Sequence, residues 1–352
     1  MDEAELEKLR ARYGNADAED IVDPTLRRAA VAALQGGVRE PPYSGHATFL
    51  DARCQEGFAG LDVALVGVPM DLGVTNRPGA RFGPRAVRQV ERIGPYHHVL
   101  KTSPLGVLKV ADVGDVPFRS RFSLGQSLAD IARYFTALAK AGVIPLSVGG
   151  DHSITYPILK ALGRERPLGL VHIDAHCDTG GAEEGEKFHH GGPFRHAVLD
   201  GVLDPRRCIQ IGIRGAAELL WEFSREAGMT VIHIEDWMAL GIDAVIARAR
   251  AVVAGGPVYI SFDVDGLDPA YAPGTGTPEV GGLSPREAQA LLHGLAGLDI
   301  VGGDVVEIAP HYDPGNGTAM VGAQMLFEML SLVAVSPRFR KEREDGRPPQ
   351  GR

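Results

Sequence analysis

Three short segments of the sequence bring acidic and histidine side chains together at a spacing suited to metal binding. They read GGDHS at residues 149–153, HIDAHCD at 172–178 and SFDVDGLDP at 261–269. Asp174, His176 and Asp178 alternate with small or apolar residues, so an extended chain points all three to one side. Asp263 and Asp265 repeat this spacing. Carboxylates crowded at the end of a buried sheet repel one another, and a bound cation keeps them ionised.

The number and type of these donors indicate how many ions are bound. The candidate metal ligands are four carboxylates and two imidazoles, namely Asp174, Asp178, Asp263, Asp265, His152 and His176. Four negative charges balance two divalent cations, with one nitrogen ligand for each. This oxygen-rich set favours Mn²⁺ over structural Zn²⁺, and Ni²⁺ stays open because imidazole and carboxylate serve both metals. Two ions that share carboxylates lower the pKa of a bridging water and make it a nucleophile.

Each acidic segment closes or follows a predicted strand. Strands are expected at residues 62–68, 106–113, 143–148, 168–174, 207–213, 230–234, 258–263 and 300–306. Helices are expected at residues 84–93, 124–141, 153–162, 216–227, 235–254, 284–297 and 318–333. Alternation of this kind predicts an α/β protein with three layers, α/β/α, around a mostly parallel sheet of about eight strands. Functional residues of such sheets lie at the carboxyl ends of the strands.

The two ends of the chain fall outside this alternation. Residues 1–60 are expected to form an N-terminal extension, with short helices near residues 4–13 and 24–34, that packs on the domain or on a neighbouring subunit. Residues 61–335 are expected to form the catalytic domain. Residues 336–352 are charged and rich in Pro and Gly, which predicts a flexible tail.

Composition excludes several classes of protein. A formal net charge of −9 weighs against binding to nucleic acid. No apolar run approaches the ~18 residues of a membrane helix, and the charged N-terminus has no secretory signal. The three cysteines form no disulfide framework. We therefore expect a cytoplasmic protein that binds neither nucleic acid nor membranes.

Other residues with reactive side chains have structural interpretations. His172 and His233 lie within apolar strands and are expected to be core histidines. His97 and His98 are expected at the surface or at an interface. Cys177 lies between two candidate ligands but out of phase with them, so it is expected to pack in the interior.

GGDHS, DAHCD and SFDVDGLDP are very similar to the three signatures of the ureohydrolase family, which includes arginase, agmatinase, guanidinobutyrase and guanidinopropionase. The resemblance runs from about residue 62 to residue 333, and it includes GVTNRPGARFGPRAVR and GGDVVEIAPHYD. HIDAHCDT and VEIAPHYDP resemble the agmatinase branch more than arginase. The resemblance implies an arginase-like fold and a hydrolase that cleaves a small non-arginine guanidine compound to urea and an amine.

The same resemblance implies roles for individual residues. One ion is held by residues matching His152, Asp174, Asp178 and Asp263, and the other by residues matching Asp174, His176, Asp263 and Asp265. Asp174 and Asp263 therefore bridge the ions, which are usually manganese. Hydroxide attacks the guanidinium carbon, and Asp178 accepts a proton. Glu307 matches the carboxylate that pairs with the guanidinium, as a planar guanidinium requires.

A histidine in a His-Gly-Thr loop of the family transfers protons to the leaving amine. The loop here reads FHHGGPF, and His190 matches that histidine by its following glycine. Gly192 replaces the threonine and removes its hydroxyl. His189 is the alternative for this role. Asn76, in the loop after the first strand, is a further candidate for contacting the substrate.

The sequence leaves the substrate open. The substrates we expect first are agmatine and a short guanidino acid (the guanidinobutyrase and guanidinopropionase reactions). Free guanidine or an alkylguanidine is the next alternative. Arg77 or Arg81 could neutralise the carboxylate of a guanidino acid, or both could be structural. Two rival interpretations are a metal-dependent deacetylase of the same fold, which uses one zinc and fewer carboxylates, and a non-catalytic subunit, which usually lacks ligands. The family resemblance also implies a homo-oligomer, a trimer or hexamer.

Overall fold

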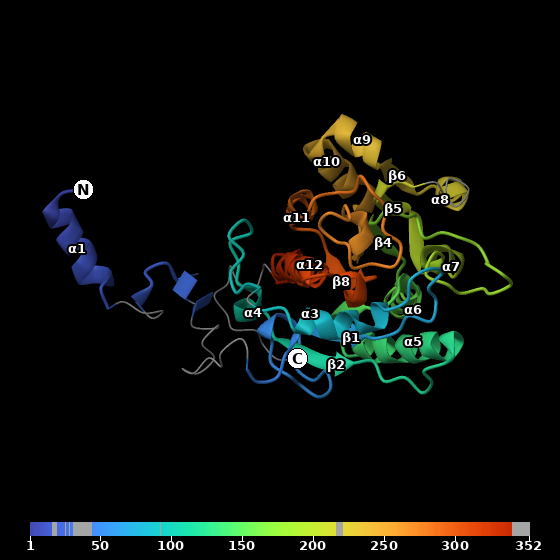
Figure 1. Cartoon of the computed structure of the whole chain (residues 1–352), viewed down its shortest axis with the longest axis horizontal. Coiled ribbons are helices and arrows are strands. Elements are labelled where there is room, and N and C mark those ends of the chain that lie inside the picture. Colours follow the sequence, from blue (N-terminus) through green and yellow to red (C-terminus); the bar gives the residue numbers. More distant parts are fainter. Residues whose placement is uncertain are drawn as a thin grey trace.

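The computed structural model describes residues 1–15, 20–24, 26–27, 29–30, 44–91, 93–215 and 221–339. Its centre is an eight-stranded sheet in the order β2-β1-β3-β8-β7-β4-β5-β6 (Figure 1). Every neighbouring pair of strands is parallel. The strands are β1 (Val63–Val68), β2 (Val110–Asp115), β3 (Ile144–Gly149), β4 (Leu168–Ile173), β5 (Leu203–Ile213), β6 (Thr230–His233), β7 (Val258–Asp263) and β8 (Ile300–Val306). The predicted three-layer α/β fold with a parallel sheet is confirmed.

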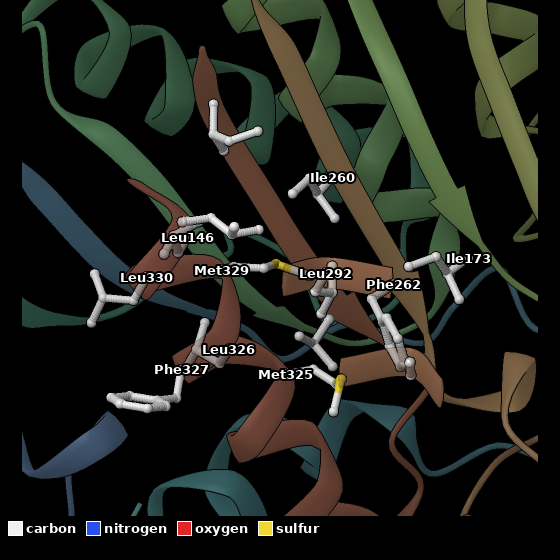
Figure 2. Close-up of a cluster of buried hydrophobic side chains, with 14 of the residues drawn as sticks. Leu146, Ile173, Ile260, Phe262, Leu292, Met325, Leu326, Phe327, Met329 and Leu330 are labelled. Atoms are coloured by element: carbon white, nitrogen blue, oxygen red, sulfur yellow. The ribbon is translucent and has the colours of Figure 1, made fainter. Parts of the chain in front are cut away.

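Helices cover both faces of the sheet because its strands are apolar on both sides. Every residue of β1, β3, β4 and β7 is buried. One apolar core lies under α3 (Gly83–Arg88), α9 (Ile234–Leu240), α10 (Ile242–Val253), α11 (Pro285–Gly294) and α12 (Gly317–Ala334). A second core lies under α5 (Leu124–Lys140), α6 (Thr155–Leu162) and α7 (Pro193–Leu199). In Figure 2, side chains of α12 such as Met325 and Met329 approach Ile260 and Phe262 of β7.

Local sequence explains where several helices begin and end. Ser284 and Glu287 form a capping box at the start of α11, with Pro285 in the first turn, as their spacing predicts. The helix expected over residues 235–254 is instead two helices, because Gly241, with φ 78°, breaks the chain between α9 and α10. A short helix, α4 (Pro104–Val107), replaces the start of the strand expected at residues 106–113.

Other boundaries differ by a few residues. The helix expected at residues 84–93 ends at Arg88, and β5 begins at Leu203, ahead of the expected residue 207. The last helix before β6, α8 (Glu222–Ala227), begins just after residues 216–220, which lie outside the described part of the chain. Most of the helix expected near residues 24–34 also lies outside it.

Helix α12 is apolar in sequence and largely buried against the sheet. An 18-residue window of it has a mean hydropathy of 1.4, long and apolar enough to cross a membrane, but 78% of that window is buried inside the protein. A core helix of a globular fold has these same properties.

Glu328 of α12 accepts hydrogen bonds from four side chains. His97 Nε2 lies 2.6 Å and His293 Nε2 3.0 Å from its Oε2, while Gln289 and Gln324 donate to its Oε1 over 2.9 and 2.8 Å. The amide of Leu100 donates to His97 Nδ1, so Nε2 carries the hydrogen that Glu328 accepts. The expectation of a surface position for His97 is wrong, and the alternative of an interface stays a prediction: His97 is 4% exposed, because the buried carboxylate of Glu328 compensates its polarity.

The N-terminal helix α1 (Glu3–Tyr13) confirms the helix expected near residues 4–13. Asp2 and Glu5 cap its first turn, and none of its residues is buried. Figure 1 shows it apart from the sheet and its covering helices. The three cysteines are all free, and Cys177 and Cys208 are buried, so the interior position expected for Cys177 is confirmed.

Candidate metal centre

The candidate site residues lie at the carboxyl ends of four adjacent strands in the middle of the sheet. His152 follows β3, Asp174 and Asp178 follow β4, Asp263 closes β7, and the residue after β8 is Glu307. Because parallel strands end at the same edge, segments far apart in sequence meet there. This is the position at which the sequence predicts the metal centre.

His152 faces three carboxylates with one ring nitrogen. Its Nδ1 lies 2.9 Å from Asp178 Oδ2 and 3.2 Å from Oδ2 of both Asp174 and Asp263. Its Nε2 lies 2.8 Å from Ser261 Oγ, and Ser261 Oγ donates to Asp304 Oδ1 over 2.6 Å. The serine therefore accepts the hydrogen of Nε2, which leaves the Nδ1 lone pair aimed at carboxylate oxygens. Among the described residues, this buried Nδ1 has no hydrogen-bond partner, and a cation between these atoms would satisfy it.

A second group of donors lies beside the first. His176 Nδ1 is 3.4 Å from Asp174 Oδ1 and 3.2 Å from Asp265 Oδ2, and these three residues can hold an ion. Asp174 thus turns one oxygen to His176 and the other to His152. Asp263 accepts the amide hydrogen of Asp265 with its Oδ1 over 2.8 Å and turns Oδ2 to His152. All six predicted metal ligands are brought together, in a donor set that fits two divalent ions.

The pKa values of the carboxylates show how unfavourable the cluster is without a cation. Burial, together with the charges of Asp265 and Asp174, raises the pKa of Asp263 well above its ordinary value. Burial and Asp174 raise the pKa of Asp265 to about 6. Burial would also raise the pKa of Asp174, but His172 and His152 outweigh it and hold this pKa well below its usual range. Bound divalent cations would allow these carboxylates to stay ionised without protons.

Two candidate residues have a backbone conformation that is rare for residues other than glycine. Asp178 has φ 50° and Glu307 has φ 62°. Conformations of this kind cost about 1–3 kcal/mol each and gather at functional sites. Each residue lies where a strand or its following loop must turn a carboxylate into the centre, so both are held there by the surrounding structure.

Glu307 is anchored through one oxygen and unpaired at the other. Its Oε1 accepts the backbone amide hydrogen of His152 over 2.8 Å and lies 2.9 Å from His190 Nδ1. Its Oε2 is buried and has no hydrogen-bond partner among the described residues. The carboxylate of Asp151 is nearby, and burial together with Glu307 raises the pKa of Asp151 to about 6. Glu307 therefore offers one free, buried acceptor beside the metal ligands.

His190, and not His189, faces Glu307. Its Nε2 lies 2.7 Å from Thr75 Oγ1 and 3.2 Å from the amide nitrogen of Thr75. Burial lowers the pKa of His190, but Glu307 outweighs it and raises this pKa to about 9. The Thr75 amide acts in the opposite direction, because an N–H aimed at Nε2 favours an unprotonated ring. The ring of His189 instead contacts its own loop, at Gly181 and Gly191.

The residues at the outer end of the site differ in their partners. Asn76 is exposed, and its Nδ2 donates to the carbonyl of Gly276 over 3.3 Å. The guanidinium of Arg77 lies over the ring of Tyr312 at 5.3 Å, without an ion-pair partner among the described residues. Arg81 forms an ion pair with the buried Asp71. Of the two arginines, Arg81 is therefore held in the structure and Arg77 is the free cation.

Several polar partners of the site were not expected from the sequence. His172 is buried in its strand as predicted, but its Nε2 also lies 2.7 Å from Asp174 Oδ2. The sequence does indicate this contact, because His172 lies two residues before Asp174 and extends the alternation of Asp174, His176 and Asp178. Thr75 and Ser261 gave no comparable signal, since their partners are 115 and 109 residues away in the sequence.

Comparison with known proteins adds an independent line of evidence. A guanidinopropionase of Pseudomonas aeruginosa is 50% identical over 300 residues, which cover 84% of this chain and 94% of that protein. A mitochondrial agmatinase of Gallus gallus is 46% identical over 293 residues, 82% of this chain and 86% of that protein. The solved structure of a proclavaminate amidino hydrolase from Streptomyces clavuligerus has a TM-score of 0.80 and 36% identity, and covers 84% of this chain and 99% of that chain.

The fold, the site and these relatives together define a metal-dependent hydrolase that acts on carbon–nitrogen bonds. The sequence model of the arginase family matches residues 61–331, and the chain belongs to that family. Enzymes of this family have a binuclear metal centre, in agreement with the two groups of donors that share Asp174.

Proposed function

We propose that the chain hydrolyses the guanidino group of a small non-arginine guanidine compound to urea and an amine. The observation that carries this proposal is the buried, unpaired Oε2 of Glu307 beside a cluster of carboxylates and imidazoles. A guanidinium presents N–H donors in a plane that suits such a carboxylate. The relatives named above, a guanidinopropionase and an agmatinase, support it.

The proposed metal ligands divide into two sets that share two bridging carboxylates. The first set is His152, Asp174, Asp178 and Asp263, and the second is Asp174, His176, Asp263 and Asp265. Ions bound there would polarise the substrate and lower the pKa of a water molecule toward neutrality. The oxygen-rich donor chemistry supports Mn²⁺, with Ni²⁺ as the alternative.

The residues around these ligands would orient the substrate and move protons. Glu307 would pair with the guanidinium through Oε2, since its Oε1 is already held by the His152 amide and by His190. Asp178 would accept a proton during attack on the guanidinium carbon. His190 would deliver a proton to the leaving amine, because Glu307 raises its pKa to about 9, above neutrality.

The far end of the substrate is the open part of the proposal. Agmatine would bring a distal ammonium, and a short guanidino acid would bring a distal carboxylate. The free guanidinium of Arg77, in the same loop as Asn76, favours the guanidino acid. Arg81 is less suited, because Asp71 already neutralises it.

A urea-release screen tests the function. The panel contains agmatine, 4-guanidinobutyrate, 3-guanidinopropionate, arginine, guanidine and methylguanidine, with Mn²⁺ and Ni²⁺ supplied separately. We expect urea from agmatine or a guanidino acid with a kcat/KM at least tenfold above that for arginine, about 1.4 kcal/mol. A tenfold preference for arginine would overturn the substrate assignment. Absence of urea from every compound, with deacetylation of an N-acetylated amine and one zinc per chain, would support the deacetylase alternative.

We also propose the remaining features that the sequence predicts: a catalytic domain over residues 61–335, a homo-oligomer (a trimer or hexamer) and a cytoplasmic location. Three free cysteines support a reducing compartment. Light scattering on the purified protein would measure the number of subunits, and elemental analysis would give the metal and its amount per chain.

A further inference from the structure

The two histidines of the metal centre turn one nitrogen inward and the other outward. The outer nitrogen of His152, Nε2, donates a hydrogen bond to Ser261 Oγ, and Ser261 donates to Asp304. This chain of hydrogen bonds ends on the fully buried carboxylate of Asp304, which also accepts a hydrogen bond from the Tyr259 hydroxyl over 2.7 Å. Imidazoles that bind metals through one nitrogen commonly donate from the other to a carboxylate, directly or through another group.

The outer nitrogen of His176 faces a carboxylate on a loop. With Nδ1 turned toward Asp174 and Asp265, Nε2 lies 3.7 Å from Glu279 Oε1. The His176 side chain is 25% exposed and the Glu279 side chain 37% exposed, so this pair lies at the rim of the centre. The separation exceeds a hydrogen bond by a few tenths of an ångström, which a small movement of the glutamate rotamer or one bridging water would close.

Arg214 ties the loop that carries Glu279 to the segment that carries Asp265. Its Nη2 donates to the main-chain carbonyls of both Asp265 and Glu279, each over 2.6 Å. Its other contacts are also main-chain carbonyls, those of Gly212, Gly266, Leu267 and Val280. The turn at residues 265–267 and the loop at residues 279–280 therefore meet on one buried guanidinium, which Asp265 and Glu279 follow by 51 and 65 residues in the sequence. Lysine cannot replace it, because a single ammonium has no planar fork of donors.

Side chains on both sides of Arg214 complete this connection. Thr277 Oγ1 donates to Asp265 Oδ2 over 3.2 Å, so the loop also contacts the proposed ligand directly. Asp268 accepts the amide hydrogens of Gly281 and Gly282 over 2.6 and 3.3 Å, which fixes the other end of the loop. The position of Glu279 relative to His176 is thus set by the same contacts that hold Asp265.

We propose that Glu279, held in place by Arg214, is the outer hydrogen-bond partner of His176 and sets the affinity of the ion that His176 binds. Glu279 is a positioning residue, because it acts on the metal only through the imidazole. A carboxylate on Nε2 fixes the ring orientation and makes Nδ1 a stronger ligand. The inference rests on the metal centre proposed above and is independent of which guanidine compound is hydrolysed.

Metal binding, measured without substrate, tests the proposal. The full-length protein is stripped of metal and titrated with Mn²⁺ against a fluorescent chelator, which gives one dissociation constant for each ion. In Glu279→Gln we expect one ion to bind about 10- to 100-fold more weakly and the other to change less than twofold. In His176→Ala, adding Glu279→Gln should have no further effect, since the two residues act in series. Arg214→Lys should weaken the same ion as Glu279→Gln.

The chain supplies a matched control in Glu183. Its Oε2 lies 3.8 Å from His189 Nδ1, a similar separation in a rim pair, but His189 is not a proposed ligand. Glu183→Gln should leave both dissociation constants unchanged. The proposal is overturned if Glu279→Gln retains both affinities, weakens both ions equally, or weakens binding further in the His176→Ala background.

Two outcomes separate this inference from the proposed function. If the wild-type protein binds two ions but releases urea from no guanidine, the function is wrong and the Glu279 measurements still decide the inference. If the wild-type protein binds fewer than two ions under saturating Mn²⁺, the binuclear centre is wrong and the inference is overturned with it. If Arg214→Lys does not fold, as circular dichroism would show, the Glu279 variants carry the test.

Discussion

His190 Nδ1 lies 2.9 Å from Glu307 Oε1. This contact fixes the orientation of the carboxylate and thereby of Oε2, which has no hydrogen-bond partner among the described residues. The amide of His152 donates to the same Oε1, so two donors fix one end of the carboxylate and leave Oε2 facing the centre. A substitution of His190 or Glu307 therefore changes how this carboxylate would pair with a positively charged group, whereas a substitution of His152 keeps the backbone amide that holds Oε1.

Glu307→Gln should lower kcat/KM by at least about 100-fold, a loss of roughly 3 kcal/mol. The two donors at Oε1 would select the amide oxygen for that position, which leaves the amide nitrogen at the place of Oε2. An N–H group would then face the N–H groups of the guanidinium. Steady-state kinetics, elemental analysis and circular dichroism on the same sample would test this, with two ions and a native spectrum expected. Activity within threefold of wild type would contradict it.

His190→Ala should lower kcat by about 10²- to 10⁴-fold, the usual range for a group that transfers protons. The metal content should not change, because His190 contacts Glu307 and Thr75. His189→Ala is the matched comparison, and it should have a smaller effect since its ring contacts its own loop. If His189→Ala were the more damaging of the two, the proton-transfer role would move to His189.

Asp174→Ala and Asp263→Ala should each remove both metal ions, because each carboxylate is assigned to both sets of ligands. Asp174 turns its two oxygens to different histidines, His176 and His152. His152→Ala should remove mainly one ion. Elemental analysis of the purified variants decides the question, and two tightly bound ions in Asp263→Ala would disprove the bridging assignment.

Glu328→Gln should lower the free energy of unfolding at pH 7 by about 1–3 kcal/mol, because four donors converge on Glu328 and an amide nitrogen would face two of them. Burial alone would raise the pKa of Glu328, but hydrogen bonds from His293 and His97 hold it well below its ordinary 4.5.

This depressed pKa gives the pH dependence its sign. The stabilisation is complete above about pH 4.5, the value in the unfolded chain, and is lost as the pH falls toward the lower pKa of the folded protein. The difference between wild type and Glu328→Gln should therefore shrink as the pH falls below about 4.5. Urea unfolding over this range measures it, with Glu7→Gln on the exposed helix α1 as the control. A difference that stays constant with pH would contradict the assigned pKa.

The sequence predicts the parallel sheet and the acidic segments well because both depend on local spacing. Apolar runs predict buried strands, and the alternation of Asp174, His176 and Asp178 needs no information from elsewhere in the chain. The break at Gly241 was missed because the apolar periodicity continues across it.

The partners of the site residues depend instead on tertiary contacts. Nothing near Thr75 indicates that its hydroxyl meets His190, and nothing near Arg214 indicates that its guanidinium joins the turn at Asp265 to the loop at Glu279. The burial of His97 has the same cause, since Glu328 is 231 residues away in the sequence. Local polarity predicts the surface for such a residue until its buried partner is known.

The place of β8 in the sheet has a consequence for synthesis of the chain. This strand is the last of the eight in the sequence, yet it pairs with β3 on one side and β7 on the other and so joins the two halves of the sheet. Chains emerge from the ribosome N-terminus first. Strands β7 and β4 pair directly, so Asp263 and Asp174 meet without β8. His152, on the β3 side, joins them only after residue 306 has left the exit tunnel, and a nascent chain therefore gains this ligand last.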